Sequence, residues 1–174
     1  MFLIVLTTFM WLALAPAGWG GEEAVHSGPP TSTSVSQSVP SDTEITLFRT
    51  NCYGGCAVYS LTIYADGRVL YEGGENSKKR GTLTSRISQE KVKELIAAFN
   101  GINYFSLADR YDHGSMDCPS WGTDMPSALT SLTLNKKKKA VNHYLGCSGS
   151  EVLGKLSWLE NKIDDAVNVK QWIE

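Results

Sequence analysis

The sequence predicts an α+β fold, with an antiparallel sheet of about five to six strands and two amphipathic helices packed on one face. Several short segments alternate apolar and polar residues and are joined by tight turns, which pairs consecutive strands antiparallel. Two later segments instead repeat their apolar residues every three or four positions, as helices do. These segments lie within residues 44–174, which predicts a single α+β domain with one hydrophobic core.

The first strands of the sheet are predicted between residues 45 and 73. Residues 45–50 and 59–64 alternate apolar and polar side chains, the pattern of half-buried strands. Asp66-Gly67 follows the second of these strands and is a strong hairpin signal, so residues 68–73 are expected to pair back. Residues 82–87 are expected to add one more strand.

The first helix is expected over residues 89–100. Ser88 precedes it as a capping residue, and Gly101 is expected to end it. Its apolar stripe consists of Val92, Leu95, Ile96 and Phe99. The residues expected to fill the core after the helix are Tyr104, Phe105 and Leu107.

A second hairpin and a second helix complete the predicted domain. Residues 131–134 and 141–145 alternate across a turn that carries Lys136 to Lys139, a solvated hairpin tip rather than a phosphate site. Ser148 to Glu151 match a capping box before a helix that reaches about residue 167. The stripe of this helix consists of Val152, Leu156, Leu159 and Ile163. Two tryptophans are expected to be packing residues, Trp158 and Trp172.

The N-terminus predicts export. Residues 2–15 form an uncharged apolar run, and Ala15 and Ala17 stand in the spacing of a signal-peptidase site, which predicts a signal peptide over residues 1–17. The alternative, an uncleaved anchor, would need about 20 apolar residues. Residues 18–43 are rich in Ser, Thr and Pro and predict a disordered linker. The mature protein is expected to be secreted or periplasmic, without stable insertion in a membrane.

The charge pattern argues against nucleic acid as a partner. The formal net charge of the chain is −2, and the lysine-rich hairpin tip is its only basic block. A nucleic-acid-binding domain is instead expected to carry a basic stripe or face.

Four cysteines, Cys52, Cys56, Cys118 and Cys147, predict two disulfides in an exported chain. Sequence alone allows three pairings. The separation of Cys52 and Cys56 by only three residues favours a disulfide between them, which leaves Cys118 to pair with Cys147 and to tie down the long irregular segment 109–126. Two alternatives for the first pair remain open, a soft-metal site or a reversible redox pair.

The cysteine region carries a resemblance to a known family. Residues Arg49 to Gly73 follow the pattern R-T-x-C-x-G-x-C-x-x-Y-x-L-T-I-x-x-D-G-x-V-x-Y-x-G, and later matches are Thr123-Asp124-x-Pro126, Thr130-Ser131-Leu132 and His143-Tyr144. With these motifs the chain resembles the family called domain of unknown function 6438 over about residues 45–165. The resemblance implies an exported bacterial α+β domain, and it supplies no activity, cofactor or catalytic residue. A proline often follows the second cysteine in this family, whereas Ala57 follows it here, which weakens an analogy to copper proteins with a C-x-x-x-C-P motif.

No arrangement of residues indicates catalysis. The sequence lacks a Ser-His-Asp spacing, a phosphate-binding loop and a paired zinc motif. His143 lies on an apolar strand face and is interpreted as a core histidine rather than a ligand or base. His113 lies near Asp109, Asp112 and Asp117, but carboxylates clustered in a loop are mostly solvated. The chain is therefore expected not to be an enzyme, and no cofactor is expected.

Two functions follow from these observations. The first is a non-enzymatic binding or inhibitory module whose partner is a protein or a small molecule. Its candidate binding surface is Tyr53, Tyr111, His113, Trp121 and Asp124. The alternative is an envelope thiol protein that handles copper or disulfides through Cys52 and Cys56, with His143 as a third copper ligand.

Overall fold

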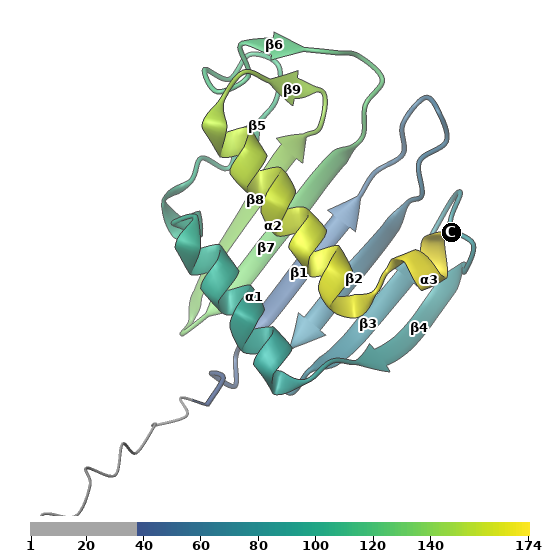
Figure 1. The fold of residues 1–174 in the computed structure, drawn as a ribbon, viewed down its shortest axis with the longest axis vertical. Coiled ribbons are helices and arrows are strands. Elements are labelled where there is room, and N and C mark those ends of the chain that lie inside the picture. The colour runs from purple at the N-terminus through teal and green to yellow at the C-terminus, as the bar shows by residue number, and fades with distance from the viewer. Residues whose placement is uncertain (1–37) are drawn as a thin grey trace, which may run out of the picture. The chain divides into compact units, whose positions relative to one another are not determined.

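A single seven-stranded sheet forms the centre of the computed structural model, which describes residues 38–174 (Figure 1). The strand order is β4-β3-β2-β1-β7-β8-β5, and all neighbouring strands are antiparallel except β5 and β8. The strands are β1 (Glu44–Arg49), β2 (Tyr59–Tyr64), β3 (Arg68–Gly73), β4 (Gly81–Arg86), β5 (Arg110–Tyr111), β7 (Ser127–Leu134) and β8 (Lys137–Tyr144). The α+β class and the mostly antiparallel sheet predicted from the sequence are confirmed, and the sheet has more strands than predicted.

Alternation of side chains sets the two faces of the sheet. Ile45 and Leu47 of β1 and their neighbours Leu61 and Ile63 of β2 are buried on one face, in register with one another. The β2–β3 hairpin turns at Gly67, whose φ of +82° is left-handed. A Cβ at this glycine would lie 2.2 Å from the carbonyl oxygen of Ile87, so only glycine fits this close approach.

The buried face is covered by two helices, α1 (Gln89–Gly101) and α2 (Glu151–Val167) (Figure 1). The Lys91 N–H donates to Ser88 Oγ at 3.3 Å, so Ser88 caps α1 as expected. Gly101, however, belongs to the helix, and the left-handed residue that follows is Asn103 with φ of 53°. The helix therefore ends at Gly101 as expected, but the left-handed position belongs to Asn103, because Asn tolerates this conformation.

The capping box predicted before α2 is also wrong. Ser148 lies in the short strand β9 (Cys147–Ser148), and the residue at the N-cap is Ser150. The Ser150 hydroxyl lies 3.4 Å from Asp117 Oδ1 rather than capping the helix. The sheet-facing side of α2 includes Leu153, Leu156, Leu159, Ile163 and Val167.

The aromatic residues divide between core and surface. Tyr104, in the 3₁₀ turn η1 (Tyr104–Ser106), is buried as expected, but Phe105 beside it is exposed. Trp172, in the short helix α3 (Lys170–Ile173), packs on Tyr71 with ring centroids 4.8 Å apart. Trp158 is 50% exposed on α2, so its expected packing role is wrong.

The folded part of the chain begins before residue 44. Val39 packs against the core, and Thr43 is buried. Asp42 accepts hydrogen bonds from the backbone N–H groups of Asn135 and Lys136 at the tip of the β7–β8 hairpin. The predicted signal peptide and the predicted linker up to residue 37 lie outside the described residues. Within residues 38–174, no helix is both long enough and apolar enough to cross a membrane.

Candidate functional site

All four cysteines form disulfides. The turn disulfide joins Cys52 to Cys56, with Cα atoms 5.2 Å apart, in the connection between β1 and β2. The loop disulfide joins Cys118 to Cys147, with Cα atoms 5.1 Å apart, and ties the 109–126 segment to the chain that follows β8. These are the pairs that the spacing of the cysteines favoured.

The turn disulfide closes a short cysteine turn, residues 52–56, that projects one aromatic side chain. Tyr53 is 91% exposed. Its backbone N–H donates to the carbonyl oxygen of Asp124 at 3.1 Å, so the turn is connected to the end of the 109–126 segment. Asn51 Oδ1 accepts from the Cys52 N–H at 2.8 Å and from Asn76 Nδ2 at 3.3 Å, which fixes the base of the turn.

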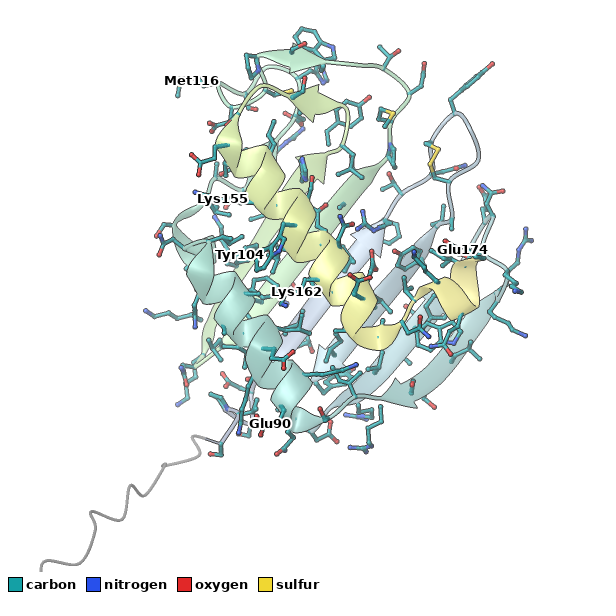
Figure 2. The ribbon with its side chains drawn as sticks, viewed as in Figure 1. Glu90, Tyr104, Met116, Lys155, Lys162 and Glu174 are labelled. Atoms are coloured by element: carbon teal, nitrogen blue, oxygen red, sulfur yellow. A yellow bond between two sulfur atoms is a disulfide. The ribbon has the colours of Figure 1, made fainter. Side chains whose placement is uncertain are left out.

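The 109–126 segment is more regular than the sequence predicts. It contains β5 and the short strand β6 (Ser120–Trp121), which pairs antiparallel with β9. Tyr144 fixes the rest of the segment, because its hydroxyl donates to the Gly122 carbonyl oxygen at 2.8 Å and accepts from the Met125 N–H at 3.2 Å. Met116 lies at the same end of the molecule as β6 and β9 (Figure 2) and is exposed.

A depression of about 500 Å³ lies between this segment and the strands β7 and β8. Its lining includes Arg110, Asp112, His113, Trp121, Asp124 and Asn142. The imidazole of His113 and the indole of Trp121 face each other at 6.2 Å, tilted by 40°. The indole remains 54% exposed.

The structure brings four of the five predicted binding residues together. His113, Trp121 and Asp124 line the depression, and Tyr53 adjoins it through its hydrogen bond to Asp124. Tyr111 is wrongly placed on this surface, since it is only 3% exposed. It pairs with His143 in the sheet, and its hydroxyl accepts from the Ala108 N–H at 3.0 Å.

The loop carboxylates form ion pairs with neighbouring basic residues. Asp112 binds the guanidinium of Arg110, and Asp109 binds the ammonium of Lys139. Within the described part of the chain, no group of three or more His, Cys, Asp or Glu side chains is arranged to hold a metal ion.

His143 lies on the other face of the sheet, under α2. It is buried, and its Nδ1 lies 2.8 Å from Glu160 Oε1, so it is a core histidine with a carboxylate partner. The second carboxylate oxygen of Glu160 lies 3.9 Å from Arg49 Nη1 and accepts no hydrogen bond from the described residues.

Sequence reasoning missed the buried polar network to which Glu160 belongs. Arg49 donates from Nε and Nη2 to Asp164 Oδ2 at 2.9 and 2.8 Å, and the Tyr59 hydroxyl donates to Asp164 Oδ1 at 2.8 Å. The network therefore bonds α2 to β1, β2 and β8. A signal was present, because Glu160 and Asp164 are one turn apart on the side of α2 that carries Leu156 and Ile163.

Burial dominates the electrostatics of this network. It raises the pKa of the Asp164 carboxyl, although Arg49 and Tyr59 act in the opposite direction. Burial alone would lower the pKa of Arg49, but the combined effects of Asp164, Tyr59 and Glu160 outweigh it, and the pKa is raised. Burial also raises the pKa of the Tyr59 hydroxyl, which therefore stays protonated and serves as a donor. The arrangement holds a helix on a sheet and keeps Arg49 charged.

Comparison with known proteins agrees with the resemblance seen in the sequence. A comparison with the curated proteins finds no match. The family model described as Domain of unknown function (DUF6438) matches residues 43–167, which includes the cysteine turn, the depression and the buried polar network. The chain belongs to the DUF6438 family.

Proposed function

We propose that this protein is an exported, non-enzymatic binding or inhibitory module. Its binding face consists of Tyr53, His113, Trp121, Asp124 and the depression between them. The observation that carries the proposal is that large, exposed aromatic side chains are held by two disulfides at one end of the sheet. Trp and Tyr contribute much of the binding energy in protein interfaces. A surface that is already rigid loses little conformational entropy on binding.

Three of the candidate acid–base groups are bound to other side chains, which supports binding rather than catalysis. Asp109 and Asp112 are engaged by Lys139 and Arg110. His143 is buried against Glu160. By contrast, a side chain that acts as a general acid or base must be able to reach the substrate proton directly or through one water molecule.

The thiol alternative uses the cysteine turn alone. The Cys56 N–H donates to Cys52 Sγ at 3.1 Å, a contact that would stabilise a thiolate at Cys52 after reduction. The copper version of this alternative loses its third ligand, because His143 lies on the face that α2 covers and is bound to Glu160. Titration of thiols before and after mild reduction tests the alternative. Free Cys52 and Cys56 in protein purified from an oxidising compartment would favour it.

Export is part of the proposal. Two disulfides are typical of proteins that fold outside the cytoplasm, and the N-terminal sequence has the pattern of a signal peptide. When the protein is expressed with its own leader in a secreting host, we expect the mature chain to begin near Gly18. N-terminal sequencing of the purified extracellular protein checks this, and an intact Met1 would contradict it.

Site-specific cross-linking tests the binding face. A photoreactive phenylalanine analogue replaces Tyr53 or Trp121 in the exported full chain, and the cells are irradiated. We expect both positions to give the same adduct and a matched position on α2, Trp158, to give none, because it is similarly exposed but lies on another element. Excess unlabelled wild-type protein should suppress the adduct, whereas a Trp121→Ala competitor should not. Equal adducts at all three positions would contradict the proposal.

A further inference from the structure

We infer that the depression beside Trp121 binds a neutral oligosaccharide, an inference that rests on the proposed binding function and names its ligand class. Three independent features of the depression point to this ligand. These are an aromatic platform, a set of small polar groups with one unused acceptor, and a balance of charge. The depression also opens onto the face of the sheet that no helix within residues 38–174 covers (Figure 1).

The aromatic platform is formed by Trp121 and His113. Their rings lie 6.2 Å apart at the edge of the depression, and the indole is 54% exposed although β6 holds its backbone. A pyranose ring presents an apolar C–H face that packs on an aromatic ring, while its hydroxyl groups point outward. An exposed aromatic side chain on a fixed backbone is suited to such a face, because little of its conformational freedom is lost on binding.

The polar groups of the depression suit hydroxyl groups. Asn142 lines the depression, and its side-chain oxygen is buried and accepts no hydrogen bond from any residue of the described chain. Asp124 and Thr123 also line the depression, and the Thr123 hydroxyl donates to Asp124 Oδ2 at 3.0 Å. Each hydroxyl of a sugar both donates and accepts, so neighbouring hydroxyl groups can satisfy an amide oxygen and a carboxylate at the same time.

The balance of charge argues against an ionic ligand. Arg110, the only Lys or Arg of the lining, is paired with Asp112, so the charges of these two groups offset each other. Asp124 alone then contributes net charge. A phosphate site would instead need unpaired basic groups or a cluster of backbone N–H donors.

The size and position of the depression favour a chain of sugars over a single one. Its volume of about 500 Å³ lies in the range of small-molecule pockets. Asn142 is paired in the sheet with Leu129, and Leu129 with Phe48, so these three share the face opposite α1 and α2. Leu129 and Phe48 are exposed and offer an apolar surface along which further sugar rings can lie.

Titration with four probes tests this inference on the mature, disulfide-bonded protein. The probes are cellotetraose, chitotetraose, maltotetraose and mannotetraose, each followed by NMR. We expect at least one of them to shift the Trp121 indole and the Asn142 side-chain amide in a saturable manner. Trp121→Ala and Asn142→Ala should each weaken that binding at least tenfold. The matched controls Trp158→Ala and Asn100→Ala, exposed residues of α2 and α1, should leave it unchanged.

The outcomes separate this inference from the proposed function. An unchanged backbone spectrum of each variant shows that a loss of binding does not arise from unfolding. Absence of shifts with all four probes overturns the oligosaccharide inference, and so does binding that Trp121→Ala leaves intact. If a protein is nevertheless cross-linked through Trp121, the binding face stands and its ligand is a protein. If neither sugar nor cross-linked partner is found, both fail.

Discussion

Replacement of Arg49 by methionine tests the buried polar network. Methionine keeps an apolar stem but removes the guanidinium, which leaves the carboxylates of Asp164 and Glu160 without their cation. The side chains of Arg49 and Asp164 are only 15% and 13% exposed, so water cannot easily replace the lost hydrogen bonds. Removal of one partner from a buried ion pair typically destabilises a protein by about 3–5 kcal/mol. We expect a loss of this size in the free energy of unfolding.

Urea denaturation measures the effect, which corresponds to a midpoint of unfolding lower by roughly 1–5 M. A matched control is Arg86→Met, because Arg86 and its partner Asp66 are 64% and 55% exposed and lie 3.8 Å apart. Such surface pairs contribute about 0–1 kcal/mol. The double variant Arg49→Met/Asp164→Asn should recover part of the loss, since it removes the carboxylate left without a cation.

The loss of unfolding free energy in Arg49→Met should also depend on pH. Burial raises the folded-state pKa of Asp164 above its unfolded value, and removal of Arg49 raises this pKa further. The stability that protonation of Asp164 contributes is therefore fully present below the unfolded pKa and lost as pH rises through the folded pKa. The gap between wild type and Arg49→Met should narrow as pH falls from about 7 toward about 4. A loss below about 1 kcal/mol, or a gap that is the same at both pH values, would refute the reasoning.

Three further predictions concern the core and the disulfides. Leu95→Ala should lower the free energy of unfolding by about 2–5 kcal/mol because it leaves a cavity. Glu94→Ala, on the exposed side of the same helix, should change it by about 0.5 kcal/mol or less, and equal effects would contradict the packing of α1. From sequence separations of 29 and 4, the loop disulfide should contribute about 3.6 kcal/mol and the turn disulfide about 1.9 kcal/mol. Replacing the loop disulfide by serines should therefore lower the melting temperature more, and the reverse order would contradict this. Trp172→Ala should cost about 3–5 kcal/mol, since its ring packs on Tyr71. Trp158→Ala should cost far less, and similar melting temperatures for the two variants would argue against the packing of α3.

The sequence could predict those elements whose pattern is local. Alternation over six residues identified β1 and β2, and Asp66-Gly67 identified the hairpin after them. The strands β5, β6 and β9 contain two residues each, too few to show an alternation of their own. They exist because the folded chain places a partner strand beside them. Pairing with a strand that is distant in sequence also explains why α2 begins later than predicted, since Ser148 takes part in β9 instead of capping the helix.

The residues of the candidate site also divide into those that the sequence could predict and those that it could not. Aromatic residues close to cysteines in the sequence could be predicted to form a binding surface, and Tyr53 and Trp121 are indeed exposed. Tyr111 could not be assigned, because its pairing with His143 turns it inward and no short-range pattern encodes that pairing. The buried network was hidden for a related reason. Arg49 and Asp164 are 115 residues apart, and charged residues on a helix are read as solvated until a buried partner is known.

The place of β1 in the sheet has a consequence for how this protein folds. β1 is followed by β2 in sequence, but its other neighbour is β7, which begins 83 positions after β1 starts. Until β7 arrives, β1 is an edge strand whose free N–H and C=O groups can pair with another chain. Closing so long a loop loses entropy before any contact is gained, so sheets of this kind fold in about milliseconds to seconds. The interval before β7 docks is therefore the stage of folding most exposed to aggregation.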